Sequence, residues 1–425
     1  MCAFSFHKLK KGRKRLAAFF LLLLLLPVSI RLTVKAEDTP LQIHAQAKDS
    51  PLQLYAQAAV LLDADSGRVL YGKNENEALP MASTTKIMTC ILALEYGNLD
   101  DIAEVSAYAA SMPKVKLYMQ KGEQYRLGDL LYSLMLESHN DSAIAIAETV
   151  GGSVEEFAAM MNQKARDIGC YDTYFITPNG LDAVVSDSGK IHSTTAADLA
   201  KIMAYCVTDS VKKEQFLQIT QTREYDFCDV SGARSFHCSN HNSFLSMMDE
   251  AISGKTGFTN KAGYCYVGAV ESEGRIFTVA LLACGWPNHK TYKWSDMTKL
   301  AQYGMERYAY RDIYEERQFS KIPVAGGIAG ADATPYERAA VTVALEESER
   351  QSLPYLLCEE DVVEVKTNLA AELEAPVVCG ESVGKVTYYL NGELIKEYEV
   401  VATEEIEKIH YTWILQYILQ LFLPG

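Results

Sequence analysis

The fold of this chain is decided by the stretch Met81-Ala82-Ser83-Thr84-Thr85-Lys86-Ile87-Met88-Thr89. Ser83 and Lys86 stand three residues apart, so on a helix they share one face and the lysine amine can reach the serine hydroxyl. A serine hydroxyl needs a neighbouring base, and a lysine in a desolvated pocket can supply one because burial lowers its pKa. N–H groups at a helix start also stabilise an oxyanion formed nearby. The stretch therefore predicts a nucleophile and its base at the start of a helix.

The Ser-to-Lys spacing recurs at Ser111 and Ser210. The motif therefore identifies a nucleophile only together with the motifs that follow it in the chain. Ser111 has a proline in its would-be first turn, and Ser210 comes too late in the chain. Ser83 is followed in order by Ser138-His139-Asn140 and Lys255-Thr256-Gly257. This order of three motifs is typical of class A β-lactamases and penicillin-binding proteins. Taken alone, Ser83 could be a helix N-cap; the three motifs together favour the nucleophile.

The N-terminus has the pattern of an export signal. A basic stretch from Lys8 to Arg15 precedes an apolar run from Leu16 to Ile30, and Val34-Lys35-Ala36 offers a cleavage site. We therefore predict a signal peptide over 1–36, with an uncleaved anchor as the alternative, and a linker over 37–56. The mature protein is expected in the cell envelope, at the outer face of the cytoplasmic membrane or secreted.

Charge and cysteine usage narrow the classes of partner. Loss of residues 1–36, which hold eight Lys/Arg and no acidic residue, takes the net charge from −15 to −23. Such an acidic chain is a poor partner for nucleic acid. The nine cysteines that remain show no C-x-x-C spacing, which predicts mostly buried free thiols and no zinc site. One bridge between Cys228 and Cys238 stays open for an exported protein.

The middle of the chain alternates short strands with a helical stretch. Strands at 59–63 and 68–71 flank Ser66-Gly67 as a hairpin, and strands at 263–270 and 275–282 form a second hairpin. Helices are expected at about 84–96, 127–136, 141–150, 195–205 and 295–308, with one more between the capping box of Ser153 and Glu156 and a stop at Gly169. This pattern predicts an α/β domain with a helical subdomain, and the motifs meet at the seam.

The C-terminal part changes character. Residues 313–334, with the glycine-rich stretch 326–331, are expected to be a linker, and 335–402 to form a small β-sandwich with a hairpin turn at Asn391-Gly392. Over 403–425, the stretch from Ile406 to Leu423 predicts an amphipathic helix. This helix would lie in a membrane interface or dock on the β domain.

Four segments carry a resemblance to a known family: Pro80–Lys86, Ser138–Ser142, Thr177–Leu181 and Gly254–Thr259. Together they resemble the low-molecular-weight penicillin-binding proteins, the serine-type D-Ala-D-Ala carboxypeptidases of peptidase family S11. The resemblance implies a β-lactamase/transpeptidase-like domain over 57–312, with an antiparallel sheet and a helical subdomain. It further implies a small all-β domain and a C-terminal amphipathic helix.

The resemblance implies catalytic roles for three side chains. Ser83 would attack the carbonyl of the terminal D-Ala-D-Ala bond of a peptidoglycan stem peptide and form an acyl-enzyme. Lys86 would take its proton and later help to activate the hydrolytic water, and Ser138 would relay a proton to the departing D-alanine. β-Lactams would be covalent inhibitors, and neither a metal nor a cofactor is implied.

The resemblance also implies which residues bind substrate. Asn140 would hold Lys86 and the substrate amide, and Lys255 would keep the site electropositive. Thr256, with Gly257 beside it, would bind the free carboxylate of the substrate. The backbone N–H groups of Ser83 and Phe258 would form the oxyanion hole.

Three positions depart from the family pattern or match it loosely. His139 stands where glycine is common, and as a loop residue without a visible partner it is expected to have no special role. Phe258 stands where some relatives carry histidine, which a backbone N–H tolerates. Lys293 lies near the position of an arginine that helps to bind carboxylate in relatives.

Other functions remain as alternatives. A β-lactamase would need a glutamate in an E-x-x-L-N loop, and the sequence between Ser138 and Lys255 has none. A β-lactam sensor or cell-wall scaffold would keep Ser83 and lose turnover. A D,D-endopeptidase would use the same site on cross-linked peptides. The preferred third residue of the stem peptide does not follow from the sequence.

Overall fold

The computed structural model describes residues 52–346 and 352–422. The predicted signal peptide and most of the predicted linker at 37–56 lie outside these ranges. The described chain divides into two compact units, one built mainly from residues up to Tyr310 and one from Arg311 onward, with 356–359 belonging to the first. Each unit is described by itself.

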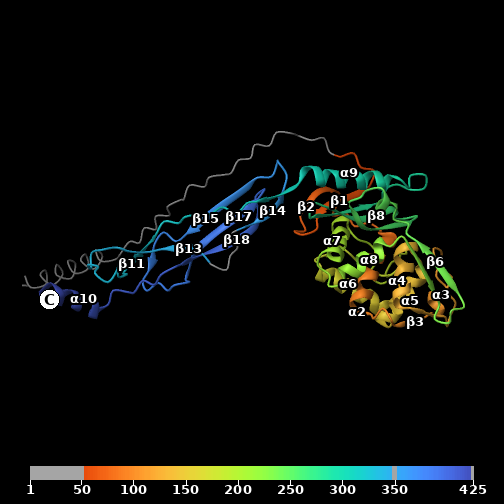
Figure 1. The fold of residues 1–425 in the computed structure, drawn as a ribbon, viewed down its shortest axis with the longest axis horizontal. Helices are drawn as coiled ribbons and strands as arrows, with labels where there is room; N and C mark the ends of the chain where they lie inside the picture. The colour runs from red at the N-terminus through yellow and green to blue at the C-terminus, as the bar shows by residue number, and fades with distance from the viewer. Residues whose placement is uncertain (1–51, 347–351, 423–425) are drawn as a thin grey trace, which may run out of the picture. The chain divides into compact units, whose positions relative to one another are not determined.

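A five-stranded antiparallel sheet forms the centre of the first unit (Figure 1), in the order β2-β1-β9-β8-β7. The strands are β1 (Ala58–Asp63), β2 (Val69–Lys73), β7 (Ala251–Thr259), β8 (Gly263–Ser272) and β9 (Arg275–Leu282). Both predicted hairpins are present. β7, which carries Lys255-Thr256-Gly257, was not predicted, because its two glycines and two threonines lack the apolar alternation of a strand. It lies at the edge of the sheet.

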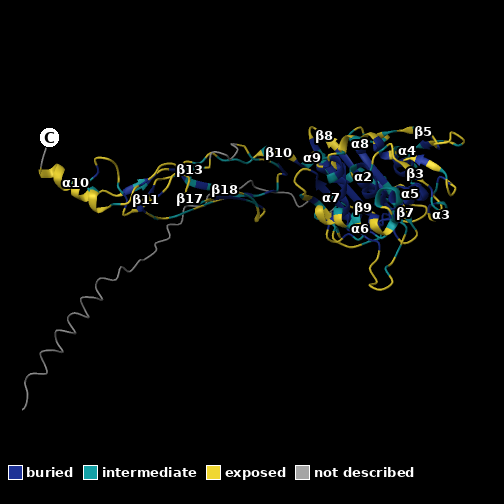
Figure 2. Cartoon of the chain, turned by 90° about the horizontal axis from the view of Figure 1, so that it is seen from below, coloured by how far each residue is buried: buried dark blue, intermediate teal, exposed yellow. Residues whose placement is uncertain are grey.

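Both faces of this sheet are buried. Successive side chains of β1 point to opposite sides of the sheet, so they enter two different cores. Val60 and Leu62 pack into the core on the helical side, whereas Ala59 and Leu61 pack into a second core beneath α9 (Tyr292–Arg307). Burial of these strands is visible as the dark interior in Figure 2. The helical side is formed by α2 (Lys86–Tyr96), α4 (Leu127–Tyr132), α5 (Asn140–Gly151), α6 (Val154–Asp167), α7 (Ala196–Val207) and α8 (Lys213–Gln221).

The helices begin and end close to the predicted positions, and two of them have capping residues at their N-termini. Ser153 accepts a hydrogen bond from the N–H of Glu156, and Thr195 caps α7 in the same way. The helix expected at 127–136 is instead α4 followed by a π-helical turn, η2 (Ser133–Glu137), because Ser138 takes a left-handed conformation (φ +66°) and ends it.

Short elements surround this layer: β3 (Ile102–Glu104), α3 (Ala107–Ala110), β4 (Gln124–Arg126), β5 (Glu224–Cys228), β6 (Ser235–Ser239) and η3 (Ser243–Ser246). The bridge left open between Cys228 and Cys238 is not formed, and both are free thiols. Cys228 faces Ser235 across the β5–β6 ladder, whereas Cys238 faces Tyr225, so the two are out of register. Cys228 is exposed and Cys238 is buried.

The second unit contains a three-stranded and a four-stranded sheet (Figure 1), in the orders β12-β11-β16 and β13-β18-β17-β15. Their strands are β11 (Ile322–Ala325), β12 (Ala339–Val341), β13 (Val343–Leu345), β15 (Val363–Leu369), β16 (Leu373–Glu374), β17 (Ser382–Leu390) and β18 (Glu393–Ala402). Two further strands, β10 (Ala309–Asp312) and β14 (Pro354–Leu357), span the boundary between the units in sequence. Asn391 and Gly392 both have positive φ in the β17–β18 turn, as a tight hairpin of this type requires.

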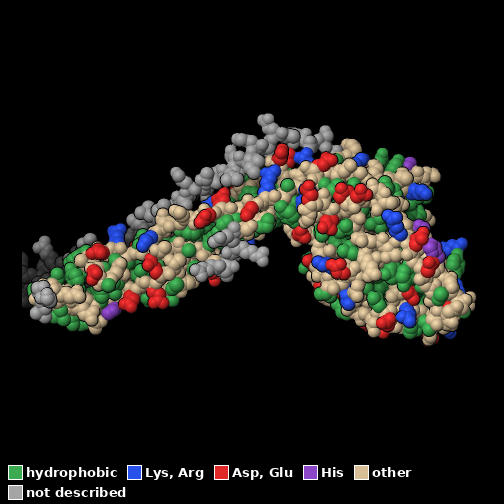
Figure 3. Space-filling view, in the orientation of Figure 1, with side chains coloured by type: hydrophobic (Ala, Val, Ile, Leu, Met, Phe, Trp, Pro, Cys, Tyr) green, Lys and Arg blue, Asp and Glu red, His purple; other side chains and the backbone are tan. Residues whose placement is uncertain are grey.

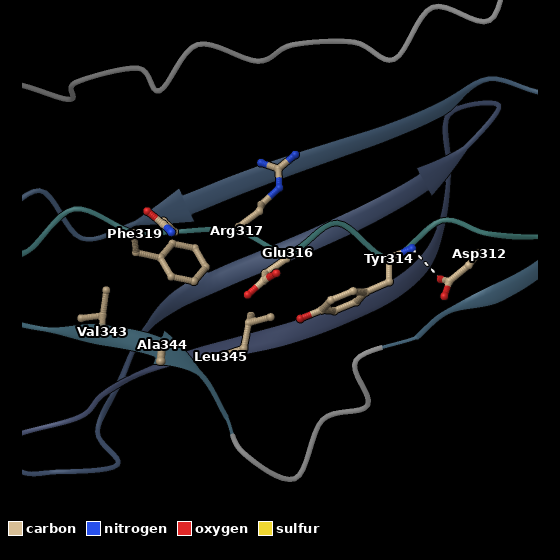
Figure 4. A pocket seen from close by; sticks show the side chains of 9 residues that line it. Asp312, Tyr314, Glu316, Arg317, Phe319, Val343, Ala344 and Leu345 are labelled. Carbon is tan, nitrogen blue, oxygen red and sulfur yellow. Dashed lines mark hydrogen bonds between the residues drawn. The ribbon is translucent and has the colours of Figure 1, made fainter.

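The stretch 313–334, expected to be a linker, belongs to the second unit. It contains β11, the middle strand of the three-stranded sheet, and Gly327 in the glycine-rich stretch pairs with Lys408. The same extended stretch borders a groove of about 680 Å³, which Figure 4 shows. Tyr314 and Phe319 line one side of the groove, and β13 forms the other.

The C-terminal helix is shorter than predicted. Residues 406–410 are not helical, because Ile406 and Lys408 pair with Val377 and Gly327, and α10 spans Tyr411–Phe422. None of the residues of α10 is buried, as Figure 2 shows, and hydrophobic side chains lie on its surface in Figure 3. Within the described part of the chain, no helix is long and apolar enough to cross a membrane.

Candidate active site

Ser83 lies in a tight turn, η1 (Ala82–Thr85), that leads directly into α2. Ala82 takes a left-handed conformation (φ +50°). The turn is held by its own hydroxyls, since Thr84 donates to the Met81 carbonyl at 2.6 Å and Thr85 donates to the Ala82 carbonyl at 2.8 Å. The side chains of the turn thus replace helical hydrogen bonds and leave Ser83 at the head of α2.

Lys86 is fully buried and contacts Ser83 directly. Its Nζ lies 2.9 Å from Ser83 Oγ, 2.9 Å from Asn140 Oδ1 and 2.6 Å from the Asn179 carbonyl oxygen. The last two atoms only accept hydrogen bonds. They take both N–H groups of a neutral amine and direct its lone pair at the Ser83 hydroxyl.

Burial also prepares Lys86 to act as a base. Desolvation lowers the pKa of Lys86 well below its usual 10.5, and the nearby charge of Lys255 lowers it further, while Asp141 opposes both effects. A lysine amine whose charged form is disfavoured in this way can accept the Ser83 proton.

Ser138 and Lys255 form the opposite side of the site. Ser138 sits in the left-handed turn between η2 and α5, and Lys255 Nζ lies 3.1 Å from its Oγ and 3.0 Å from the Thr256 carbonyl. Burial lowers the pKa of Lys255 to about 7. The pair therefore offers a hydroxyl beside an amine that exchanges its proton near neutral pH.

β7 closes the site next to the nucleophile. A Cβ at Gly257 would lie 3.0 Å from the backbone nitrogen of Ser83, so glycine lets the strand pass close to the turn. Ser83, Ser138, Lys255, Thr256, Gly257 and Phe258 all border one cleft of about 440 Å³. Lys86 and Asn140 lie behind its wall, where Lys86 contacts Ser83 and Asn140 contacts Lys86. All eight predicted site residues are thus brought together.

Two contributors to the site escaped sequence reasoning. The Asn179 carbonyl that holds Lys86 is a backbone atom in the loop at 177–181. This segment contributed to the family resemblance, but no role in the site was assigned to it. Gly180 (φ +84°) allows this loop to approach, because a Cβ there would lie 2.0 Å from the Ala82 carbonyl oxygen. The Thr89 hydroxyl donates to the Pro178 carbonyl at 2.6 Å and ties the loop to α2.

His192 is the second contributor that was missed. Its Nδ1 accepts the N–H of Ile176 at 3.0 Å, and its Nε2 lies 2.8 Å from the Thr85 hydroxyl. Burial lowers the pKa of His192 to about 3, so the ring is neutral. An isolated histidine at this distance in sequence gives no signal of contact with the nucleophile turn.

Two family models match this chain. Residues 44–284 match the family model described as D-alanyl-D-alanine carboxypeptidase. This chain belongs to the D-alanyl-D-alanine carboxypeptidase family. Residues 341–408 match a second model, the C-terminal domain of penicillin-binding protein 5. The α/β transpeptidase-like fold and the small all-β domain that were predicted from the sequence are confirmed.

Carboxypeptidases from several bacteria are similar along most of their length. D-alanyl-D-alanine carboxypeptidase DacF of Bacillus subtilis is 29% identical over 367 residues, which cover 84% of this chain and 88% of the relative. The structure of penicillin-binding protein 5 from Haemophilus influenzae is 25% identical with a TM-score of 0.62, covering 85% and 100% of the two chains. Penicillin-binding protein D2 of Listeria monocytogenes, solved in a cefotaxime-bound form, is 27% identical with a TM-score of 0.52, covering 60% and 100%.

The structure shows the contacts of His139 and Lys293, two positions that depart from the family pattern or match it loosely. His139, expected to have no special role, is buried with Nδ1 2.8 Å from the Ser133 hydroxyl, and burial lowers its pKa. The partner that the sequence did not reveal comes from η2. Lys293 borders the cleft, with Nζ 4.9 Å from the ring centre of Tyr264 and 4.5 Å from that of Trp294. These rings hold its ammonium group near the cleft by cation–π contact.

Proposed function

We propose that this carboxypeptidase removes the terminal D-alanine from peptidoglycan stem peptides through an acyl-enzyme on Ser83. The observation that carries the proposal is the 2.9 Å contact between Ser83 Oγ and the fully buried Lys86 amine. Both N–H groups of this amine have acceptors elsewhere, so its lone pair is available to the serine. The family supplies the reaction class, and the geometry supports this assignment of roles.

Acylation follows from the positions of four groups. Lys86 takes the Ser83 proton while Oγ attacks the carbonyl of the D-Ala-D-Ala bond. The N–H groups of Ser83 and Phe258 receive the oxyanion, since Gly257 keeps the strand close to the turn. The C–N bond then breaks, and a proton delivered through Ser138 from the neighbouring Lys255 neutralises the departing amine.

Deacylation reverses the proton transfers. Lys86 first gives up the proton that it took from Ser83, and this proton replaces the one that Lys255 donated to the departing amine. The neutral Lys86 then takes a proton from a water molecule that attacks the ester of Ser83. The product carboxylic acid leaves, and Oγ regains its proton from Lys86. Asn140 and the Asn179 carbonyl hold the amine in place during both steps.

Substrate recognition uses the free edge of β7. An extended peptide can add to this edge through its backbone, as in strand addition. The Thr256 hydroxyl and the ammonium groups of Lys255 and Lys293 border the same cleft and would bind the terminal carboxylate. A β-lactam with a carboxylate beside a reactive amide fits the same arrangement and would acylate Ser83.

The decisive experiment measures D-alanine release from a peptide ending in D-Ala-D-Ala by the mature chain and by Ser83→Ala. Each protein is also incubated with a fluorescent penicillin. We expect the wild type to release D-alanine and to be labelled, and the variant to do neither. Labelling without release would favour a β-lactam sensor, and release from cross-linked peptides alone would favour an endopeptidase.

We further propose that the protein is exported and contacts the membrane surface through α10. The basic and apolar N-terminal pattern supports export. Tyr411, Leu421 and Phe422 are more than 60% exposed, and no α10 residue is buried. A 12-residue helix of this kind is suited to lie in the interface of a bilayer.

A further inference from the structure

Asp141 is a completely buried carboxylate in the first turn of α5. Its Oδ1 accepts the N–H of Leu117 at 2.9 Å, and its Oδ2 accepts the N–H of Met119 at 3.2 Å. The N–H of Ser142 also donates to Oδ1, at 3.0 Å. A buried charge is stabilised only when its oxygens are satisfied, and here two of the three donors come from one segment, 113–119. Asp141 therefore fastens this segment to the start of α5.

The fastened segment in turn contacts Asn140. The Asn140 N–H donates to the Val115 carbonyl at 2.8 Å, and Asn140 Nδ2 reaches the Pro113 carbonyl at 3.3 Å. Because the amide nitrogen is directed at Pro113, the amide oxygen is directed at Lys86. The segment thus determines which way the Asn140 side chain faces.

The same segment supplies part of the cleft wall. Val115 borders the cleft, and 54% of it is exposed. The remaining wall is polar or charged over much of its extent, with Ser138, Lys255 and Lys290 among its residues. An exposed valine there offers an apolar contact to a substrate.

We propose that Asp141 is a positioning residue that holds the segment 113–119, so that Asn140 keeps its oxygen on Lys86 and Val115 contacts the aliphatic part of the stem peptide. This inference rests on the proposed function. Asp141 and Val115 would determine how efficiently the carboxypeptidase reaction proceeds. Asp141 acts through Asn140, whereas Val115 touches the substrate.

The first test is Asp141→Asn in the full mature chain. An amide can accept only on its oxygen, so one of the two segment N–H groups loses its partner. We expect kcat/KM for D-alanine release to fall about 100-fold, as for a displaced catalytic group, with kcat carrying most of the loss. Fluorescent penicillin labelling should slow in parallel. Hydrogen exchange at Leu117 and Met119 should become faster.

Asp198→Asn is the matched control. Asp198 is also buried, and its Oδ2 accepts the N–H of Asp172 and the hydroxyl of Thr173, both at 2.9 Å, away from the cleft. This variant should keep kcat/KM within about two-fold per folded molecule, because Asp172 and Thr173 precede the part of the loop, from Ile176 to Asn179, that contacts His192 and Lys86. Faster exchange at Leu117 and Met119 in Asp141→Asn without a loss of kcat/KM would overturn the positioning role. So would a loss of kcat/KM without faster exchange.

Val115→Ala keeps the inference testable even if Asp141→Asn does not fold, because the side chain is exposed. We expect KM to rise several-fold while kcat stays within about two-fold, the pattern for a lost binding contact. An unchanged KM would overturn the contact. A wild type that labels with penicillin and releases no D-alanine would instead defeat the proposed function, and the labelling rates of Asp141→Asn would still test the positioning role.

Discussion

The hydroxyl of Thr85 lies 2.8 Å from Nε2 of His192, a residue 107 positions further along the chain. Because His192 Nδ1 accepts a backbone N–H, the proton of the neutral ring is on Nε2 and is donated to Thr85. The Thr85 hydroxyl in turn donates a hydrogen bond to the Ala82 carbonyl. These two hydrogen bonds fix the residue that precedes the nucleophile.

His192 should make the stability of the first unit sensitive to acid. Its pKa of about 3 in the folded protein lies below the usual 6.5, so the unfolded chain binds a proton that the folded chain does not. Its contribution to stability is therefore complete above pH 6.5 and is lost as the pH falls towards 3. Between pH 7.5 and 4.5 the loss should be about 3 kcal/mol in the free energy of unfolding.

Urea unfolding of the wild type and His192→Gln at these two pH values measures this contribution. The variant should be less stable at pH 7.5 and should lose less stability on acidification. The exposed His289→Gln is the control and should follow the wild type. Equal pH dependence of all three proteins would contradict a buried, neutral His192.

The pH dependence of catalysis should be bell-shaped. kcat/KM should rise as the pH passes the lowered pKa of Lys86, because only the neutral amine can take the Ser83 proton. It should fall as the pH passes about 7, where Lys255 loses the charge that attracts the substrate carboxylate. Initial rates from pH 5 to pH 10 at low substrate measure both limbs.

Lys255→Arg separates the two limbs, because a guanidinium stays charged throughout this range. Its falling limb should move to higher pH or disappear, whereas the rising limb should remain. A rate that is still rising at pH 10 in the wild type would contradict the lowered pKa of Lys86.

Gly180→Ala should lower kcat/KM although Gly180 does not border the cleft. The new Cβ would lie 2.0 Å from the Ala82 carbonyl oxygen, so the loop must retreat and take the Asn179 carbonyl away from Lys86. We expect kcat/KM to fall about 100-fold. Gly189→Ala also has a positive φ (+67°) but meets nothing within 4 Å, so it should cost only about 1–2 kcal/mol of stability and leave kcat/KM unchanged. Similar activities of the two variants would contradict this role of Gly180.

Membrane contact through α10 can be measured by sedimentation with neutral phospholipid vesicles. The mature chain should sediment with them, and a chain ending at His410 should not. Ile418→Glu places a charge on the apolar face of α10 and should weaken binding about 10-fold. Gln416→Glu places the same charge on the polar face, between Thr412 and Gln420, and should have little effect. Binding that survives truncation at His410 would rule out α10 as the contact.

Sequence reasoning predicted those features that side-chain patterns encode. The hairpin at Ser66-Gly67, the helix cap at Ser153 and the meeting of Ser83 with Lys86 follow from spacing and local chemistry. β7 was missed because its small and polar residues are chosen for contact with the nucleophile turn and substrate, so they give no strand pattern. Function had overridden the propensity on which strand prediction relies.

Features that depend on backbone atoms or distant contacts could not be read in advance. The Asn179 carbonyl would be present whatever residue stood there, and only the fold brings it to Lys86. His139 acquired a partner because a π-helical turn, which has no sequence signature of its own, returned Ser133 to it. The C-terminal helix begins late because Ile406 and Lys408 pair with Val377 and Gly327, which lie far away in sequence.

Six of the buried cysteines of the first unit are free thiols with a shifted pKa: Cys90, Cys170, Cys206, Cys238, Cys265 and Cys284. Burial raises the pKa of each of them, so the reactive thiolate is suppressed. A core built in this way does not rely on oxidative folding. The catalytic unit should mature equally well under reducing and oxidising conditions, and dithiothreitol should leave its melting temperature unchanged.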